Sequence, residues 1–174
     1  MRSSKNYAKI IHQVGEIQMD KYILSQMNRK NFSKATNEIY LLTDYNHKQY
    51  PEYLKWYYSK NIPRVLNGSG EIIFYLDGLT VAGLAILKKD PDEAKICTLM
   101  LSEEYRKKGY SKELLESSFE FLGTDKPLIT IPSNRIEEFQ GIISTYNWCE
   151  SLKTDIYLSE EIVFNAPKTL KRKI

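Results

Sequence analysis

The chain has 174 residues, 42% of them apolar and 27% charged, which is enough length and apolar content for one domain with a buried core. Eight glycines and six prolines are too few for a fibrous or low-complexity chain. The 25 Lys and Arg residues against 22 Asp and Glu residues leave a net charge of +3, which is too small to demand a nucleic-acid partner.

The distribution of charge argues against a membrane span and an export signal. The longest stretch without a charged residue, 139–149, has eleven residues, whereas a spanning helix needs about 20 apolar residues. Glu16 and Asp20 interrupt the apolar stretch that a signal peptide requires after its basic start.

Cys97 and Cys149 match neither a disulfide framework nor a metal spacing. We therefore expect a cytoplasmic protein with reduced cysteines, no bound metal and no membrane partner.

The first third of the chain predicts a helical arm, a strand and a helix. Residues 1–36 are polar, with apolar residues near helical spacing, and predict an N-terminal helical arm laid against the domain. Glu38–Thr43 is rich in residues that favour strands, so we expect the first strand there. Pro51 suits the first turn of a helix, which we expect to end by Pro63.

A run of three antiparallel strands is expected next. Glu71–Leu76 and Leu79–Leu87 are β-branched, aromatic and apolar, and Asp77 and Gly78 between them are typical of a two-residue hairpin turn. Lys88–Ala94 contains a further turn, and a third strand is predicted from there to Leu101.

The remainder alternates helices and strands. Helical spacing predicts a helix from about Ser111 that Gly123 ends, and 127–131 predicts a short strand. Asn134 followed three residues later by an acidic residue is typical of a capping box, so we expect a helix to about Tyr146.

After that helix the sequence predicts a return to extended structure. Asn147 suits a left-handed helix end, Trp148 then begins an extended piece, and Asp155–Phe164 predicts the last strand. The order of elements predicts an α+β fold with a mixed, largely antiparallel central sheet flanked by helices.

The turn between Leu101 and Ser111 is the most informative segment. It joins a strand to a helix, and the first N–H groups of a helix have no intrahelical partner and attract anions. Gly109 lets a phosphate approach the main chain closely, and small Ser111 leaves similar clearance. The basic run 106–108 adds positive charge. The turn therefore predicts a site for a phosphate-bearing ligand.

This turn resembles the central motif of the GNAT superfamily, the acyl-CoA-dependent N-acetyltransferases. That motif is Arg or Gln, two residues, Gly, one residue, and Gly or Ala. It stands here from Arg106 to Ser111, with serine at the last small position. The resemblance implies a three-layer α/β/α domain of the acyl-CoA N-acyltransferase type over 37–166. The arm 1–36 would precede it and a basic tail, 167–174, would follow.

The resemblance also implies acetyl-CoA as the cofactor. In the family, the strand before the motif diverges from its neighbour and its main chain pairs with the pantetheine arm. Amides of the motif hold the pyrophosphate. Leu99 and Leu101 would then offer main-chain groups, while their side chains could equally be ordinary sheet core. The residues expected to contact the cofactor are Leu99, Leu101, Arg106, Lys107, Lys108, Gly109, Tyr110, Ser111 and Asn134.

For the general acid, the family commonly uses a Tyr a few residues before a Gly-Phe pair. Asn147 and Trp148 match that pair best, which puts Ile143 at the expected tyrosine position. Tyr146 and Ser144 are the nearby hydroxyl candidates, although a Tyr near a helix end often packs with its hydroxyl in water.

For the general base, Glu93 is the best carboxylate, acting through a water, with a solvated turn residue as the alternative. The resemblance implies direct attack of an amine on the thioester, with a backbone N–H stabilising the oxyanion.

The acceptor stays open at this stage. An aromatic cluster lies where the family places its acceptor side; most of it is expected to be core, with Tyr50 and Trp56 lining the pocket. Its members are Tyr45, Tyr50, Tyr53, Trp56, Tyr57 and Tyr58. A small metabolite, a protein amino group and a charged tRNA are all acceptors within the family, and a homodimer is also open. A silent acyl-CoA-binding module and a nucleic-acid-binding domain using 106–108 and the tail are the alternatives.

Overall fold

A seven-stranded sheet organises the part of the chain that the computed structural model describes, namely residues 19–48, 50–155 and 159–167. The strand order is β1-β2-β3-β4-β5-β7-β6, and every neighbouring pair is antiparallel except β4 and β5. The strands are β1 (Asp20–Ile23), β2 (Gly70–Asp77), β3 (Thr80–Asp90), β4 (Glu93–Leu101), β5 (Leu128–Pro132), β6 (Glu150–Thr154) and β7 (Glu161–Phe164).

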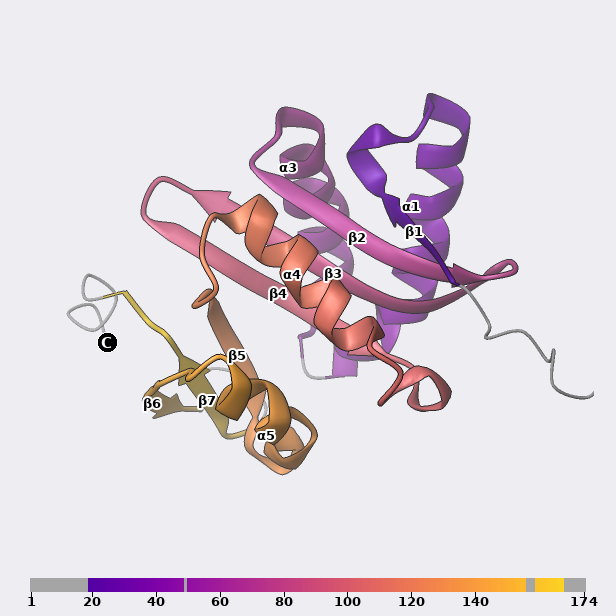
Figure 1. Cartoon of the computed structure of the whole chain (residues 1–174). Helices are drawn as coiled ribbons and strands as arrows, with labels where there is room; N and C mark the ends of the chain where they lie inside the picture. The colour runs from indigo at the N-terminus through magenta and orange to yellow at the C-terminus, as the bar shows by residue number, and fades with distance from the viewer. Residues whose placement is uncertain (1–18, 49, 156–158, 168–174) are drawn as a thin grey trace, which may run out of the picture.

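Helices cover both faces of the sheet (Figure 1). Residues of α4 and α5 pack in one apolar cluster, and residues of α1, α2 and α3 pack in another. The expected mixed, largely antiparallel sheet in a three-layer arrangement is thereby confirmed. The helices are α1 (Arg29–Thr43), α2 (Tyr53–Trp56), α3 (Ile62–Asn67), α4 (Tyr110–Leu122) and α5 (Ile136–Thr145).

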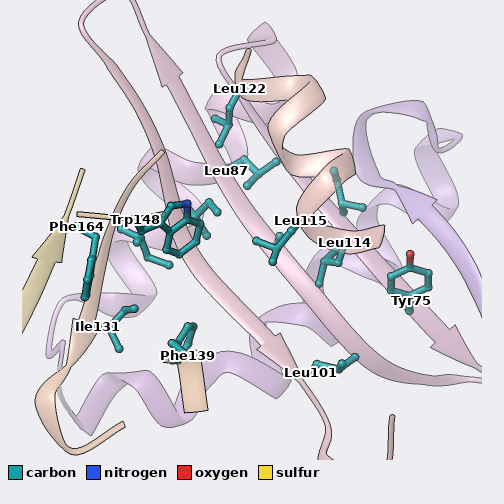
Figure 2. Close-up of a cluster of buried hydrophobic side chains, with 14 of the residues drawn as sticks. Tyr75, Leu87, Leu101, Leu114, Leu115, Leu122, Ile131, Phe139, Trp148 and Phe164 are labelled. Atoms are coloured by element: carbon teal, nitrogen blue, oxygen red, sulfur yellow. The ribbon is translucent and has the colours of Figure 1, made fainter. Parts of the chain in front are cut away.

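Strand β3 separates the two cores. Ala85 and Leu87 belong to the cluster beneath α4, whereas Leu84 and Ile86 belong to the cluster beneath α1 and α3. All four side chains are fully buried, because successive residues of a strand point to opposite faces and both faces are covered. Figure 2 shows Leu87 beside the leucines of α4 in the first cluster.

The N-terminal segment corrects two predictions. Glu38–Thr43 is not a strand but the second half of α1, whose N-cap Asn28 accepts a hydrogen bond from the Asn31 amide at 3.0 Å. Within the helical arm predicted over 1–36, Asp20–Ile23 instead forms β1 and pairs with β2, whereas 29–36 is helical and begins α1. Residues 1–18 of that arm lie outside the described residues.

The helix predicted to end by Pro63 runs on to Asn67. A π-helical turn, Tyr57–Asn61, joins α2 to α3, and Pro63 lies in the first turn of α3. Gly68 with φ 80° then ends α3.

The β2–β3 hairpin is confirmed, with its turn one residue later than expected. Asp77 and Thr80 still pair, so the two turn residues are Gly78, with φ 59°, and Leu79. The left-handed helix ends at Gly123 and Asn147 are confirmed by φ values of 75° and 51°.

Two expectations near the C-terminus are corrected. The capping box at Asn134 does not form, because that residue lies in a 3₁₀ turn, Ser133–Arg135, and Arg135 is the N-cap of α5 without a side-chain cap bond. The last strand is shorter than Asp155–Phe164: β7 begins at Glu161, and 156–158 and the basic tail 168–174 lie outside the described residues.

Candidate acyl-CoA and acceptor site

Strands β4 and β5 separate halfway along β4. Their ladder contains only the pairs Lys95–Leu128 and Ile96–Ile129, and β5 then turns away from β4 (Figure 1). At the same point the β3–β4 register shifts, so that Cys97 is an extra residue between the paired positions 96 and 98. Such a bulge disrupts the ladder and increases the local twist. The edge of 97–101 that faces β5 is therefore open to a ligand, as the family resemblance implies.

The turn after β4 carries the anion-binding features of the sequence motif. Gly109, with φ 91°, is the N-cap of the 13-residue α4, and a Cβ placed on it would meet no atom within 4 Å. Lys107 also has a positive φ of 60°, and Lys107 and Lys108 are exposed. Because the first N–H groups of α4 and its dipole point into this open space, the residues fit a phosphate group.

Arg106 holds the turn in place. Its Nε donates to the Leu101 carbonyl at 3.2 Å, and its guanidinium lies 3.3 Å from a Glu138 carboxylate oxygen on α5. The Tyr105 hydroxyl donates to Asp77 in the hairpin, and this bond raises the pKa of Tyr105 to about 12. The loop is thus tied to three elements.

A cavity of about 510 Å³ lies beside the separated strands. It is lined by Glu93, Leu99 and four members of the aromatic cluster that the sequence singled out, namely Tyr45, Tyr50, Tyr53 and Trp56. Its walls come from the aromatic segment before and within α2, from 95–99 of β4, from β5 and from the start of α5. The volume is in the usual range for small-molecule sites.

Glu93 lines this cavity and belongs to an ion-pair network. Lys88 approaches Glu93 at 2.6 Å and Asp90 at 3.1 Å, and Asp90 also pairs with Arg64. Burial lowers the pKa of Lys88, but its hydrogen bonds to Glu93 and Asp90 outweigh that effect and raise it overall. Glu93 is therefore engaged by an ammonium group.

Glu161 is a site residue that the sequence reading missed. Its side chain is fully buried at the start of β7, with Oε1 3.5 Å from the Tyr50 hydroxyl and 3.4 Å from the Ser159 hydroxyl. Its Oε2 is buried and has no hydrogen-bond partner among the described residues, and burial raises the pKa of the carboxyl. The available signal was a charged residue directly before the apolar run Ile162–Phe164.

The other catalytic candidates lie outside the cavity. The Tyr146 ring packs against Phe119 and Trp148, with centroid separations of 4.9 and 6.3 Å, and burial raises the pKa of its hydroxyl. Ser144 is exposed on α5, and Ile143 is part of the apolar cluster beneath α4. The structure therefore brings Glu93, but not Tyr146 or Ser144, to the cavity, and all three roles stay predictions.

The remaining cofactor candidates are placed as follows. Leu101 is buried in the apolar cluster beneath α4, and the partly buried Leu99 packs against that cluster and also lines the cavity. Tyr110 and Ser111 begin α4, where the Tyr110 ring packs against Tyr75 at 5.5 Å. Asn134 is exposed beside the cavity residue Arg135. Their contacts with a cofactor stay predictions.

Two searches of the described residues found nothing. No described helix is long and apolar enough to cross a membrane. Within the same residues, no group of three or more His, Cys, Asp or Glu side chains could hold a metal ion.

Sequence and structure comparisons define the class of the protein. The model of the Acetyltransferase (GNAT) family matches residues 32–128, more than half of the chain. The chain therefore belongs to the GNAT acetyltransferase family. A search of curated proteins gives no match. The domain boundaries at 36/37 and 166/167 stay predictions.

Solved structures share the fold at low sequence identity. A GNAT-family acetyltransferase of Desulfovibrio desulfuricans is 8% identical, with a TM-score of 0.60 over 84% of this chain and 97% of that one. A Pyrococcus horikoshii OT3 protein is 15% identical, with a TM-score of 0.55 over 85% and 99%. A protein described as a probable acetyltransferase of Staphylococcus epidermidis is 12% identical, with a TM-score of 0.54 over 84% and 97%.

Proposed function

We propose that the chain transfers an acetyl group from acetyl-CoA to a primary amine by direct attack. The observation that carries the proposal is the separation of β4 from β5 after Ile96. The next helix along the chain is α4, whose N-cap is Gly109. Along the chain, the open edge of β4 is therefore followed by the N-terminus of α4. An extended arm that ends in a diphosphate matches both features.

Each part of the site has a distinct task in this proposal. The main chain of Leu99 and Leu101 pairs with the pantetheine arm, and the amides of 107–111 hold the diphosphate. Acetyl-CoA would supply a thioester: the neutral amine nitrogen forms a bond to its carbonyl carbon and gives up a proton, the carbon–sulfur bond breaks, and the leaving thiolate takes up a proton. A backbone N–H on the open edge of β4 stabilises the developing oxyanion.

The environment of Cys97 supports direct attack. This residue lies at the β4 bulge and lines the cavity, and it is the cysteine nearest to the proposed reaction centre. Burial raises the pKa of its thiol, so the reactive thiolate form is disfavoured. A covalent acetyl-enzyme formed on Cys97 is therefore not part of the proposed reaction.

Release of free CoA thiol in the presence of an amine panel tests the proposal. We expect thiol release to require both the enzyme and an amine, and to rise with pH as the amine loses its proton. The control is acetyl-CoA with enzyme and no amine, which reports simple hydrolysis. Thiol release that does not depend on any amine would contradict amine acetylation.

One observation favours a second candidate, a catalytically silent acyl-CoA-binding module. The hydroxyl side chains near the expected acid position, Tyr146 and Ser144, do not line the cavity. This alternative predicts that acetyl-CoA stabilises the protein against heat without turnover of any amine. General acid–base catalysis contributes about 10²- to 10⁴-fold, so turnover without Tyr146 stays chemically accessible.

A further inference from the structure

Ion pairing among the charged side chains that line the cavity leaves two cations unmatched. The charged lining residues are Lys60, Lys88, Lys95, Arg135, Glu52 and Glu93. Both carboxylates are matched, since Glu93 pairs with Lys88 and Glu52 pairs with Lys55. Arg135 is matched by Glu138 of α5. Lys60 and Lys95 form no ion pair with any described residue, so the unmatched charge at the cavity is positive.

Of these two cations, Lys95 is the one at the proposed reaction centre. Lys60 is exposed, whereas Lys95 is half-buried in β4, two residues before the bulge residue Cys97. Burial raises the pKa of the Cys97 thiol, and of the charged groups that lower it Lys95 has the largest effect. The charge of Lys95 therefore acts at the point where β4 opens.

The fold does not need a lysine at this position. Lys95 is directly opposite Lys88 in the β3–β4 ladder, and like charges in that arrangement are destabilising. Lys88 is neutralised by Glu93 at 2.6 Å and by Asp90 at 3.1 Å, but Lys95 has no such partner among the described residues. A half-buried cation loses hydration, and without an ion pair nothing offsets that loss. An anionic ligand in the cavity would supply the missing counter-ion.

Glu161 does not supply that counter-ion. Its carboxyl is fully buried, is not part of the cavity lining and forms no ion pair with Lys95. Burial raises the pKa of this carboxyl, and the charge of Lys95 is among the smaller effects that lower it. An ionised Glu161 would offset only one of the two unmatched cations, so the cavity would still have a surplus of positive charge.

We propose, building on the proposed acetyl transfer, that the acceptor is a primary amine that also carries an anionic group, a carboxylate or a phosphate, several bonds from its nitrogen. Lys95 binds the anionic group, and the neutral amine reaches the open edge of β4. Lys95 and Thr98 are three residues apart in β4, about 10 Å in an extended strand. The site therefore favours a spacer of several atoms over an acceptor with both groups on one carbon.

The same charges disfavour a polycationic acceptor. A second ammonium group would be held near Lys95 and Lys60, where like charges repel. Aromatic side chains of Tyr53, Trp56 and Phe139 also line the cavity, so an apolar or aromatic spacer suits it. The bonds formed and broken are those of the proposed acetyl transfer, and the products are the N-acetyl derivative of the anionic amine and CoA.

Sets of acceptors that differ only in the remote group test this substrate class. The first set is 4-(aminomethyl)benzoate, benzylamine and 1,4-bis(aminomethyl)benzene. The second is 6-aminohexanoate, hexylamine and 1,6-diaminohexane. The third, for phosphate, is 3-aminopropyl phosphate, 3-aminopropanol and 1,3-diaminopropane.

In at least one set we expect kcat/KM, expressed per concentration of free amine at one pH, to be at least about tenfold higher for the anionic member than for the neutral one. The dication should be the poorest member of that set. The set that shows the preference distinguishes a carboxylate from a phosphate. A neutral or dicationic member that equals or exceeds the anionic one in every set would overturn the proposal.

Lys95→Gln and Lys34→Gln form the matched variants. Lys34 is an exposed residue of α1 outside the cavity, so its variant should keep the preference for the anionic acceptor. In Lys95→Gln the ratio of kcat/KM between the anionic and neutral members should fall to about one. In Lys95→Glu the dication should become the better substrate, with the affinity for CoA unchanged. An unchanged ratio in both Lys95 variants would contradict the contact with the anionic group.

Calorimetric binding of 4-(aminomethyl)benzoate, 6-aminohexanoate, 3-aminopropyl phosphate and their neutral partners, without acetyl-CoA, separates this proposal from the proposed function. Tighter binding of an anionic member that is lost in Lys95→Gln supports the anion-binding acceptor site even where transfer fails. Turnover of acetyl-CoA on amines without any preference for the anionic member keeps the proposed function and overturns the anionic acceptor.

Discussion

At the scale of single residues, the buried carboxyl of Glu161 makes the stability of the fold depend on pH. Its carboxyl is fully buried, and burial raises its pKa. The unfolded chain ionises this group near the ordinary glutamate value, about 4.3. As the pH rises beyond that value, the unfolded state loses the proton first and the folded state becomes relatively less stable. The loss stops once the folded carboxyl has also ionised.

We therefore expect Glu161→Gln to raise the melting temperature of the protein more at pH 8 than at pH 4.5. The neutral amide has a similar shape and removes the cost of the buried charge. Scanning calorimetry of the two proteins at both pH values measures this. A gain of the same size at both pH values, or a loss at pH 8 alone, would show that the buried carboxyl does not limit stability.

The sequence could identify some of the site residues and not others. Arg106 to Ser111 form a continuous motif, so their spacing is visible in the chain, and the structure places them at the start of α4. Glu161 is connected to the cavity by its contact with Tyr50, which lies 111 residues earlier in the chain. A contact between residues so far apart leaves no local pattern in the sequence. Tyr146 was a candidate because it lies close in sequence to the expected acid position. Its ring packs against Phe119, and the sequence alone does not predict that contact.

At the scale of elements, the strand–turn–helix unit from β4 to α4 carries the proposed cofactor site. Its strand and helix were predicted from periodicity. The family resemblance implied the separation of β4 from β5, but periodicity did not, because the separation depends on a bulge at Cys97 and on a ladder of only two pairs. Bulge and ladder are properties of pairing between distant segments, which single-sequence periodicity does not report.

We expect Gly109→Glu to lower the affinity for CoA at least 100-fold, because the new side chain puts bulk and negative charge where the diphosphate is held. Gly68→Glu is the matched control. Both glycines have a positive φ, 91° and 80°, and a Cβ at either meets nothing within 4 Å. The backbone strain is therefore similar, but Gly68 lies at the end of α3.

Titration calorimetry of both variants with CoA makes the comparison. A similar affinity in Gly109→Glu and in Gly68→Glu would remove the start of α4 from the cofactor site. Loss of binding in both would point to general damage to the fold, which circular dichroism of each variant would show.

The errors in secondary structure have a common cause. Glu38–Thr43 contains residues that favour strands, but Ala35, Ile39 and Thr43 are buried at helical spacing, so tertiary packing of α1 overrides that preference. Strand β1 has only four residues and is stabilised by its pairing with β2. Pairing of that kind is not visible in a window of four residues.

At the scale of the whole molecule, cofactor binding is expected to stabilise the fold. The proposed site joins β4, the turn after it and α4, which belong to the larger of the two cores. A ligand that binds only the folded state at 100 times its Kd adds about 2.7 kcal/mol. For a chain of this size that corresponds to a rise in melting temperature of about 5 to 11 °C.

Thermal unfolding with and without acetyl-CoA measures this rise. The wild type and Gly68→Glu should show it, and Gly109→Glu should not. An unchanged melting temperature of the wild type at millimolar acetyl-CoA would contradict specific binding to the folded state.

A crystal structure of the protein with acetyl-CoA tests the central claim most directly. We expect the diphosphate against the main-chain amides of 107–111 and the pantetheine arm along the open edge of 97–101. The thioester should face the cavity that contains Tyr50 and Lys95. A cofactor bound at another surface, with β4 and the start of α4 untouched, would contradict the account.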